Sequence, residues 1–196
     1  MLEARDLTFA YPGAAPVLQG VSLAVEPGER VALTAPSGRG KTTLCQLLAG
    51  YLQPACGQVL ADGAPLPTRG ACPVQMIWQH PERVLDPRLT LGRSLEQAGS
   101  PQPRVVEALG IRPQWMSRYP HELSGGELQR FCIARALGAS PRYLIADEVS
   151  TMLDAVTQAQ LWGFLLEEQQ RRGFGMLLVT HAPQLQELLA TRVVEL

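Results

Sequence analysis

A short run of small residues that ends in a lysine and two threonines carries the clearest chemical pattern in the chain. Lys41 is the only lysine among 17 basic residues. Glycines let backbone N–H groups approach phosphate oxygens, and a helix that begins after the run adds its dipole and free N–H groups. A lysine here neutralises terminal phosphates, and the next hydroxyl is a Mg²⁺ ligand. The candidate phosphate ligands are Pro36, Ser37, Gly38, Arg39, Gly40, Lys41, Thr42 and Thr43, with Thr42 also a metal ligand.

Two positions of this run, residues 35–43, depart from the general phosphate-loop pattern. Ala35 stands where glycine is usual, but Pro36 favours an extended conformation there, which alanine tolerates. Arg39 is a bulky charge at a position that is usually small, and the sequence leaves open whether it faces solvent or phosphate. Taken alone, the run also fits an ordinary turn between a strand and a helix.

Two adjacent carboxylates follow an apolar run at residues 143–146. Asp147 and Glu148 would lie at the carboxyl end of a buried strand, where nucleotides bind in parallel sheets. Because neighbouring strand positions point in opposite directions, their roles should differ. We assign Asp147 to the shell of a metal ion and Glu148 to general-base catalysis on water.

A third pattern spans residues 123–130. Ser124 and Glu127 have the spacing of a capping box at the start of a helix. Gly125 and Gly126 stand between them and would leave backbone N–H groups open to an anion. A helix cap with no further role is the plainer interpretation of this segment taken alone.

Alternating strands and helices must position these groups. The predicted strands are 2–11, 17–25, 30–34, 57–61, 74–78, 143–146, 176–180 and 192–195, and the predicted helices are 41–49, 125–138, 155–171 and 183–189. This alternation predicts an α/β domain with a mainly parallel sheet. Residues 81–123 are rich in proline and arginine, with short helical patches at 91–98 and 104–109, and predict a small inserted helical region.

The composition excludes several other classes of protein. A chain of 196 residues suits one domain, and 46% hydrophobic against 18% charged residues is too apolar for disorder. A net charge of -1 argues against a nucleic-acid partner. No apolar run reaches the roughly 18 residues of a membrane span, and charges within the first ten residues argue against a secretory signal. The 4 scattered cysteines favour reduced thiols.

In this order and spacing the motifs resemble the nucleotide-binding subunit of ATP-binding-cassette (ABC) transporters, over essentially the whole chain. The phosphate loop, residues 123–129 as the family signature and the Asp147–Glu148 pair carry the resemblance. Residues that are uninformative alone then match further family positions. These are Tyr11 as the adenine-stacking aromatic, Gln79 as the glutamine that touches Mg²⁺ and the membrane partner's groove, residues 150–154 as the loop that crosses to a second subunit, and His181 as the switch histidine. Val149 replaces a proline that is frequent in the family.

The resemblance implies a P-loop NTPase core with an N-terminal antiparallel β subdomain and an inserted helical subdomain. Residues 1–196 would form a single ABC ATPase domain. Within it, residues 1–80 and 139–196 would form the β subdomain and the nucleotide-binding core, and residues 81–138 the helical signature subdomain.

The resemblance also implies a dimer that encloses two ATP molecules with Mg²⁺. The phosphates would be held by the phosphate loop of one subunit and capped by Ser124, Gly125, Gly126 and Glu127 of the other. The implied catalytic residues are Glu148, His181, Gln79 and Lys41, and the implied Mg²⁺ ligands are Thr42, Gln79 and Asp147. ATP binding would close the dimer and hydrolysis would reopen it.

Separate transmembrane permease subunits are the implied partners, because the chain itself has no apolar span. The expected position is therefore peripheral, on the cytoplasmic face of the cell membrane. Residues 79–88 and 146–154 resemble the oligopeptide, dipeptide and nickel importer branch, which suggests an extracytoplasmic substrate-binding protein as a further partner. The short stretch after His181 predicts that the C-terminal extension usual in that branch is missing.

Two alternatives stay open. One is a soluble ABC ATPase that serves translation or DNA repair, although such proteins usually carry two cassettes or a coiled-coil insertion. The other is a degenerate nucleotide-binding partner of a heterodimer, spoiled by Ala35, which the retention of Lys41, Gln79, Glu148 and His181 disfavours. The sequence does not identify the transported substrate, nor does it separate a homodimer from a heterodimer.

Overall fold

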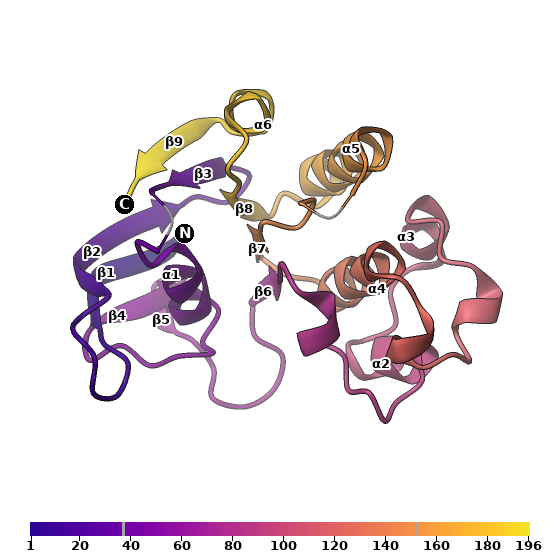
Figure 1. Ribbon diagram of the computed structural model, residues 1–196. Helices are drawn as coiled ribbons and strands as arrows, with labels where there is room; N and C mark the ends of the chain where they lie inside the picture. The colour runs from indigo at the N-terminus through magenta and orange to yellow at the C-terminus, as the bar shows by residue number, and fades with distance from the viewer. Residues whose placement is uncertain (37, 152) are drawn as a thin grey trace.

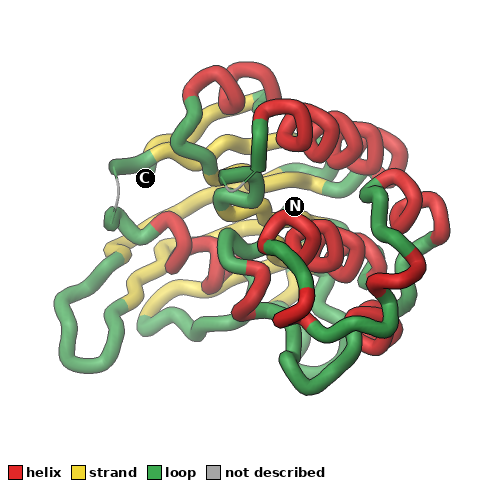
Figure 2. The backbone as a smooth tube through the Cα atoms, turned by 45° about the vertical axis from the view of Figure 1, so that its right-hand side comes forward, coloured by secondary structure: helices red, strands yellow, loops and turns green. Residues whose placement is uncertain are grey.

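The computed structural model describes residues 1–36, 38–151 and 153–196. Its strands form two sheets on one side of the molecule, and most helices between residues 91 and 172 gather on the other side (Figure 1). The view in Figure 2 shows the same division, with the yellow strands next to one another and red helices along their flank. Residue 37, on the predicted phosphate loop, and residue 152, on the predicted crossing loop, lie outside the described residues.

The first sheet is antiparallel and has the strand order β2-β1-β4-β5. Its strands are β1 (Leu2–Phe9), β2 (Leu18–Val25), β4 (Cys56–Ala61) and the two-residue β5 (Ala64–Pro65). Asp6 interrupts the pairing of β1 with both neighbours and has a positive φ of 52°. Such an irregularity bends a strand and increases its twist.

The second sheet is parallel throughout and has the order β6-β7-β8-β3-β9. Its strands are β3 (Arg30–Thr34), β6 (Val74–Ile77), β7 (Tyr143–Asp147), β8 (Gly175–Val179) and β9 (Arg192–Glu195). Every residue of β7 and β8 is buried, as expected of central strands covered on both faces. Because all five strands run the same way, the residues that follow them meet at one edge of the sheet.

Six α-helices and three short 3₁₀ helices connect the strands of the described chain. The α-helices are α1 (Lys41–Leu48), α2 (Leu91–Gln97), α3 (Pro103–Ala108), α4 (Gly125–Gly138), α5 (Ala155–Arg172) and α6 (Pro183–Leu189). The 3₁₀ helices η1 (Pro81–Arg83), η2 (Pro113–Trp115) and η3 (Pro120–Glu122) each begin with a proline. A proline fits the first helical position because its missing N–H would be unpaired there in any case.

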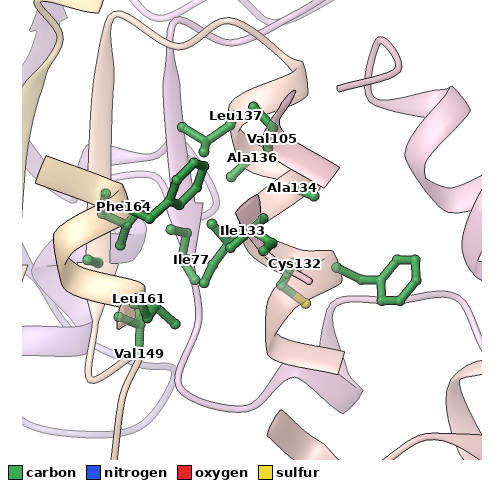
Figure 3. Packing of buried hydrophobic residues seen from close by; sticks show 14 of the residues in the cluster. Ile77, Val105, Cys132, Ile133, Ala134, Ala136, Leu137, Val149, Leu161 and Phe164 are labelled. Carbon is green, nitrogen blue, oxygen red and sulfur yellow. The ribbon is translucent and has the colours of Figure 1, made fainter. Parts of the chain in front are cut away.

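One cluster of buried apolar side chains joins the parallel sheet to the helices after β6. Ile77 of β6, Ile133 of α4 and Phe164 of α5 belong to it, and Figure 3 shows them facing one another. Full burial of a side chain of this size contributes about 1.5–3 kcal/mol relative to exposure. This cluster therefore holds α4, and the signature segment at its start, against the sheet.

A second cluster contains residues of both sheets and of α1. Leu44 and Leu48 of α1 are buried together with Leu7 of β1 and Val31 of β3. Helix α1 is thus fixed between the antiparallel and parallel sheets. The phosphate loop, which enters α1 from β3, is anchored at both ends.

The predicted α/β class with a mainly parallel sheet is confirmed, and β9 has the predicted bounds 192–195. The first strand is shorter than predicted, because β1 ends at Phe9 before the turn at Pro12 and Gly13. The strand β5 and the three 3₁₀ helices were not predicted, since two or three residues are too short to show a periodicity. None of the helices described is long and apolar enough to cross a membrane.

Candidate active site

The carboxyl edge of the parallel sheet brings together four segments that carry predicted site residues. The phosphate loop follows β3, Gln79 follows β6, Glu148 follows β7, and His181 follows β8. These segments surround a hollow of about 440 Å³, which we call the loop hollow. Its lining residues are Tyr11, Val17, Gly38, Gly40, Lys41, Thr42, Thr43, Gln79, Glu148 and His181.

Glycine is required at the end of the phosphate loop. Gly40 has a φ of +89°, and a Cβ at this position would lie 2.9 Å from carbons of both Val17 and Leu18. Ala35, by contrast, is not among the residues with positive φ, so alanine fits there without backbone strain, as predicted. Arg39 is exposed on the loop, and its backbone N–H donates to the Pro36 carbonyl at 3.4 Å.

The Lys41 side chain is folded over its own loop. Its Nζ donates to the carbonyl oxygens of Ala35 at 2.8 Å and Pro36 at 3.2 Å, and the residue is only 7% exposed. These contacts hold the ammonium at the loop hollow. An incoming anion would therefore meet a positive charge held beside the hollow, which it can draw away from the loop carbonyls.

Glu148 is held by residues from the two neighbouring strands. Its Oε1 lies 2.8 Å from His181 Nε2, and its Oε2 accepts a hydrogen bond from Gln79 Nε2 at 2.8 Å. Its backbone has a φ of +50°, an uncommon conformation for a side chain of this size. Strained backbone of this kind persists where surrounding contacts enforce it, and it is frequent at functional sites.

Asp147 is buried beneath this group. It is 2% exposed, and its Oδ1 has no hydrogen-bond partner among the described residues. Burial raises the pKa of its carboxyl above the usual value, against the opposing effect of the Thr42 hydroxyl. Glu148 adds to the rise, while Lys41 and His181 act against it.

An unpaired carboxylate oxygen beside a hydroxyl is the type of donor that Mg²⁺ takes. In the described part of the chain, no three His, Cys, Asp or Glu side chains gather around a metal position. Mg²⁺ commonly uses one or two protein ligands together with waters and substrate phosphates. The donors at Asp147 and Thr42 therefore fit a magnesium ion that arrives with a phosphate ligand.

The signature segment lies around a different hollow. The predicted capping box is present at the start of α4: Ser124 Oγ accepts from Glu127 N at 3.4 Å, and Glu127 Oε2 accepts from Ser124 N at 2.8 Å. The Ser124 backbone N–H and the Ser124 hydroxyl both donate to Glu127 Oε2, and these two hydrogen bonds lower the pKa of Glu127. This second hollow, which we call the signature hollow, has a volume of about 580 Å³. Its lining residues are Gly110, Arg112, Trp115, Ser124, Gly125, Gly126, Glu127, Arg130, Leu153, Asp154 and Thr157.

Leu153 and Asp154, a few residues after Glu148 in the chain, line the signature hollow. Asp154 caps α5, with Oδ1 accepting from the N–H groups of Val156 at 3.1 Å and Thr157 at 3.0 Å. Leu153 packs so closely on Gly126 that a Cβ there would lie 3.2 Å from Leu153 Cδ2. The backbone of the signature segment is thus in direct contact with Leu153, which follows Asp147 and Glu148 in the chain.

Two side-chain interactions near these sites were not predicted from the sequence. Gln129 of α4 donates to the Trp78 carbonyl at 3.2 Å and so ties the signature helix to the residue before Gln79. Arg112 stacks over the Trp115 ring at 5.3 Å beside the signature segment. Neither pair follows a spacing rule, because each joins residues through the tertiary fold or within an irregular turn.

The sequence of this chain is similar to those of several known proteins. The family model described as "ABC transporter" matches residues 18–151. A putative peptide import ATP-binding protein of Brucella ovis is 35% identical over 92% of this chain and 63% of that protein. A glutathione import ATP-binding protein of Salmonella typhimurium is 34% identical over 90% of this chain and 31% of that protein. The chain therefore spans less than two thirds of the length of these relatives.

Solved structures share the whole fold. An ATP-binding subunit of an ABC transporter superposes with a TM-score of 0.88 and 28% sequence identity, covering 100% of this chain and 85% of that one. A dimeric ATP-binding cassette in a post-hydrolysis state with ADP and Pi superposes with a TM-score of 0.86 at 22% identity, covering 100% of this chain and 94% of that one. The second similarity extends to the fold alone.

Proposed function

The chain belongs to the ABC transporter family of ATP-binding domains, and we propose that it binds and hydrolyses ATP to drive a membrane transporter. The observation that carries this proposal is the meeting of the phosphate loop and Glu148 around one hollow, with Asp147 buried against Thr42 of that loop. Phosphoryl transfer to water needs mainly positioning and charge neutralisation, and this hollow offers groups for both.

Binding of the triphosphate falls to the phosphate loop. Lys41 moves its ammonium from the loop carbonyls to the terminal phosphates, while Gly38, Gly40 and the first turn of α1 present backbone N–H groups. Thr42, Asp147 and Gln79 would hold Mg²⁺, which would supply charge neutralisation to the bound triphosphate. Tyr11, at the rim of the same hollow, offers its ring to the adenine base.

In the proposed hydrolysis step Glu148 acts on the attacking water, and Gln79 and His181 are the residues that contact Glu148. Both oxygens of Glu148 accept contacts from these two residues. We propose that Gln79 and His181 release Glu148 once ATP is bound, with His181 donating to the γ-phosphate and Gln79 as a residue that would hold Mg²⁺. Glu148 is then free to orient a water molecule for attack on the γ-phosphate.

The separate signature hollow supports an active dimer. Ser124 and Gly126 line that hollow and not the loop hollow of the same chain. We propose that the signature segment of a second subunit covers the γ-phosphate bound at the loop hollow, so that each ATP lies between two chains. Residues 81–138 act as the helical subdomain that carries the signature, and residues 1–80 and 139–196 form the β subdomain and core.

The proposed output is work on separate transmembrane permease subunits at the cytoplasmic face of the membrane. The relatives named as peptide and glutathione import proteins support an importer, and we propose peptides, nickel or a metal complex as its cargo. An extracytoplasmic substrate-binding protein completes such a system. The second ATP-binding subunit is either an identical chain or a related one.

The test of this function is the Glu148→Gln variant, which keeps the size of the side chain and removes its basicity. We expect ATP turnover to fall at least 100-fold, in the range of a lost general base, while ATP binding persists and an ATP-dependent dimer accumulates. Steady-state phosphate release and light scattering measure the two effects.

Glu187→Gln, on the exposed face of α6, is the matched control and should hydrolyse ATP at the wild-type rate. Turnover that survives Glu148→Gln would contradict the role of Glu148 as base. A wild-type chain that binds no ATP would contradict the proposed function as a whole and favour a degenerate partner subunit.

A further inference from the structure

Tyr11 is held at the rim of the loop hollow by two contacts of different kinds. Its ring meets the Phe9 ring edge to face, with centroids 5.0 Å apart and planes at 89°. Its hydroxyl lies 3.2 Å from Thr43 Oγ1. The side chain is otherwise open to solvent, since Tyr11 is 42% exposed and stands before the turn of residues 12–14.

The partner of this hydroxyl is part of the phosphate loop. Thr43 is only 6% exposed and lies in the first turn of α1, two residues after Lys41. Helix α1 is fixed between the two sheets by Leu44 and Leu48. The hydrogen bond therefore connects an exposed aromatic ring to one of the most firmly held elements at the site.

We infer that the Tyr11 hydroxyl is a positioning group, which uses Thr43 to fix the ring where a nucleotide base stacks. This inference rests on the proposed ATP site, and it concerns the hydroxyl rather than the ring. An exposed tyrosine samples several rotamers, and a ligand that stacks on it must first select one. A ring that is already fixed spares the ligand that entropy cost.

The arrangement also joins two parts of the ligand site. One end of the Tyr11–Thr43 pair faces the base and the other belongs to the loop that holds the phosphates. Loss of the hydroxyl should therefore weaken ligands that carry a base and leave ligands without a base unaffected. Loss of the ring should weaken base-carrying ligands further, because stacking itself is then removed.

The experiment compares ATP with inorganic triphosphate as ligands of the whole chain, measured by calorimetry with Mg²⁺. We expect Tyr11→Phe to weaken ATP binding about three- to tenfold, the range for one immobilised side chain, and to leave triphosphate binding unchanged. Tyr11→Leu should weaken ATP binding more than Tyr11→Phe does. In a Thr43→Val background, Tyr11→Phe should have no further effect on ATP affinity.

Tyr51→Phe is the matched control, because Tyr51 is also exposed and also packs its ring against another aromatic, Trp78, but does not line the loop hollow. It should bind both ligands as the wild type does. Wild-type ATP affinity in Tyr11→Phe, or an equal loss for ATP and triphosphate, would overturn the inference while the proposed function stands. A wild-type chain that binds neither ligand would overturn both.

Discussion

At the scale of single residues, Lys41 shows why one basic side chain cannot replace another. Its ammonium fits between the carbonyls of Ala35 and Pro36, and the residue is almost completely buried. A guanidinium is a planar fork with five donors and needs more space than this. The compositional bias that leaves 16 of the 17 basic residues as arginine stops at this position.

We therefore predict that Lys41→Arg loses ATP affinity although it keeps the charge. A loss of at least tenfold is expected, about 1.4 kcal/mol or more, and titration with a fluorescent ATP analogue measures it. Arg93→Lys on the exposed face of α2 is the opposite exchange and should change nothing. Normal affinity in Lys41→Arg would mean that charge alone suffices at the loop.

Residue spacing predicted which side chains gather at the carboxyl edge of the sheet better than it predicted what they contact. The phosphate loop and the Asp147–Glu148 pair are local runs, so their types and order are visible in the sequence. The contacts of Glu148 with Gln79 and His181 join residues 69 and 33 positions away, through strand pairing. No local pattern reports such contacts, and the positive φ of Glu148 follows from the same tertiary restraints.

At the scale of elements, the conformation of the loop before α1 requires glycine at the position of Gly40. The residue combines a φ of +89° with neighbours that leave no room for a Cβ. We predict that Gly40→Ala destabilises the fold by about 1–3 kcal/mol and weakens ATP binding. Urea unfolding and calorimetry measure the two effects.

Gly63 provides the matched control for this prediction. It has a similar φ of +79°, but nothing lies within 4 Å of the place where its Cβ would be. Gly63→Ala should therefore lower the free energy of unfolding by about 1 kcal/mol, because only the strain of a Cβ at positive φ is added. It should not affect ATP binding. Equal losses of stability in both variants would show that the side chains of Val17 and Leu18 can shift to make room for the added Cβ at little cost in free energy.

The end of α5 carries a buried carboxylate that makes stability depend on pH. Glu168 is completely buried and pairs with Arg171 and Arg172 of its own helix and with Arg104 of α3. Burial acts to raise its pKa, but Arg171 and Arg172 outweigh burial and hold the pKa below its usual value. The resulting stabilisation is present above the usual glutamate pKa and is lost as the pH falls through the lowered one.

We predict that the free energy of unfolding of the wild type falls between pH 6 and pH 3, in the acid range where carboxylates titrate, and falls less in Glu168→Gln. The variant should also be less stable at pH 7, by about 3 kcal/mol, because three arginines lose a buried partner. Glu187→Gln, whose side chain is exposed and makes no ion pair in the described chain, should keep the wild-type slope. Parallel slopes for all three proteins would exclude Glu168 as a source of the pH dependence.

The types of most helices and strands could be predicted from the sequence, but the elements that each one packs against could not. Buried strands such as β7 and β8 are continuous apolar runs, and α4 and α5 are long enough to show helical spacing. The Arg104–Glu168 pair could not be foreseen, since it joins α3 to α5 across 64 positions. Proline-started 3₁₀ turns escape detection because three residues define no period.

At the scale of the whole molecule, the separation of the two hollows predicts that the chain is active only in pairs. Gly126 lines the signature hollow and is packed against Leu153. We predict that Gly126→Ala still binds ATP at the loop hollow but fails to form the ATP-dependent dimer. Light scattering in the Glu148→Gln background, with and without ATP, measures this.

Gly163→Ala is the control for that prediction. Gly163 also lies within an α-helix, and nothing lies within 4 Å of its Cβ position. Its replacement by alanine should stabilise α5 by up to about 1 kcal/mol and leave dimer formation intact. A dimer that forms normally in Gly126→Ala would remove the signature segment from the proposed interface.

The placement of two unlike hollows on one chain also sets the symmetry of any assembly. If a loop hollow meets a signature hollow through a two-fold axis, the two contacts form in the same motion and the assembly closes at two chains. Any other rotation makes head-to-tail contacts, which close into a larger ring or continue as an open filament whose end chains keep a free hollow. In the two-fold arrangement, nucleotides enclosed between chains should be counted two per pair or none, so the stoichiometry of trapped ATP together with the number of chains in the assembly reports the geometry of the contact.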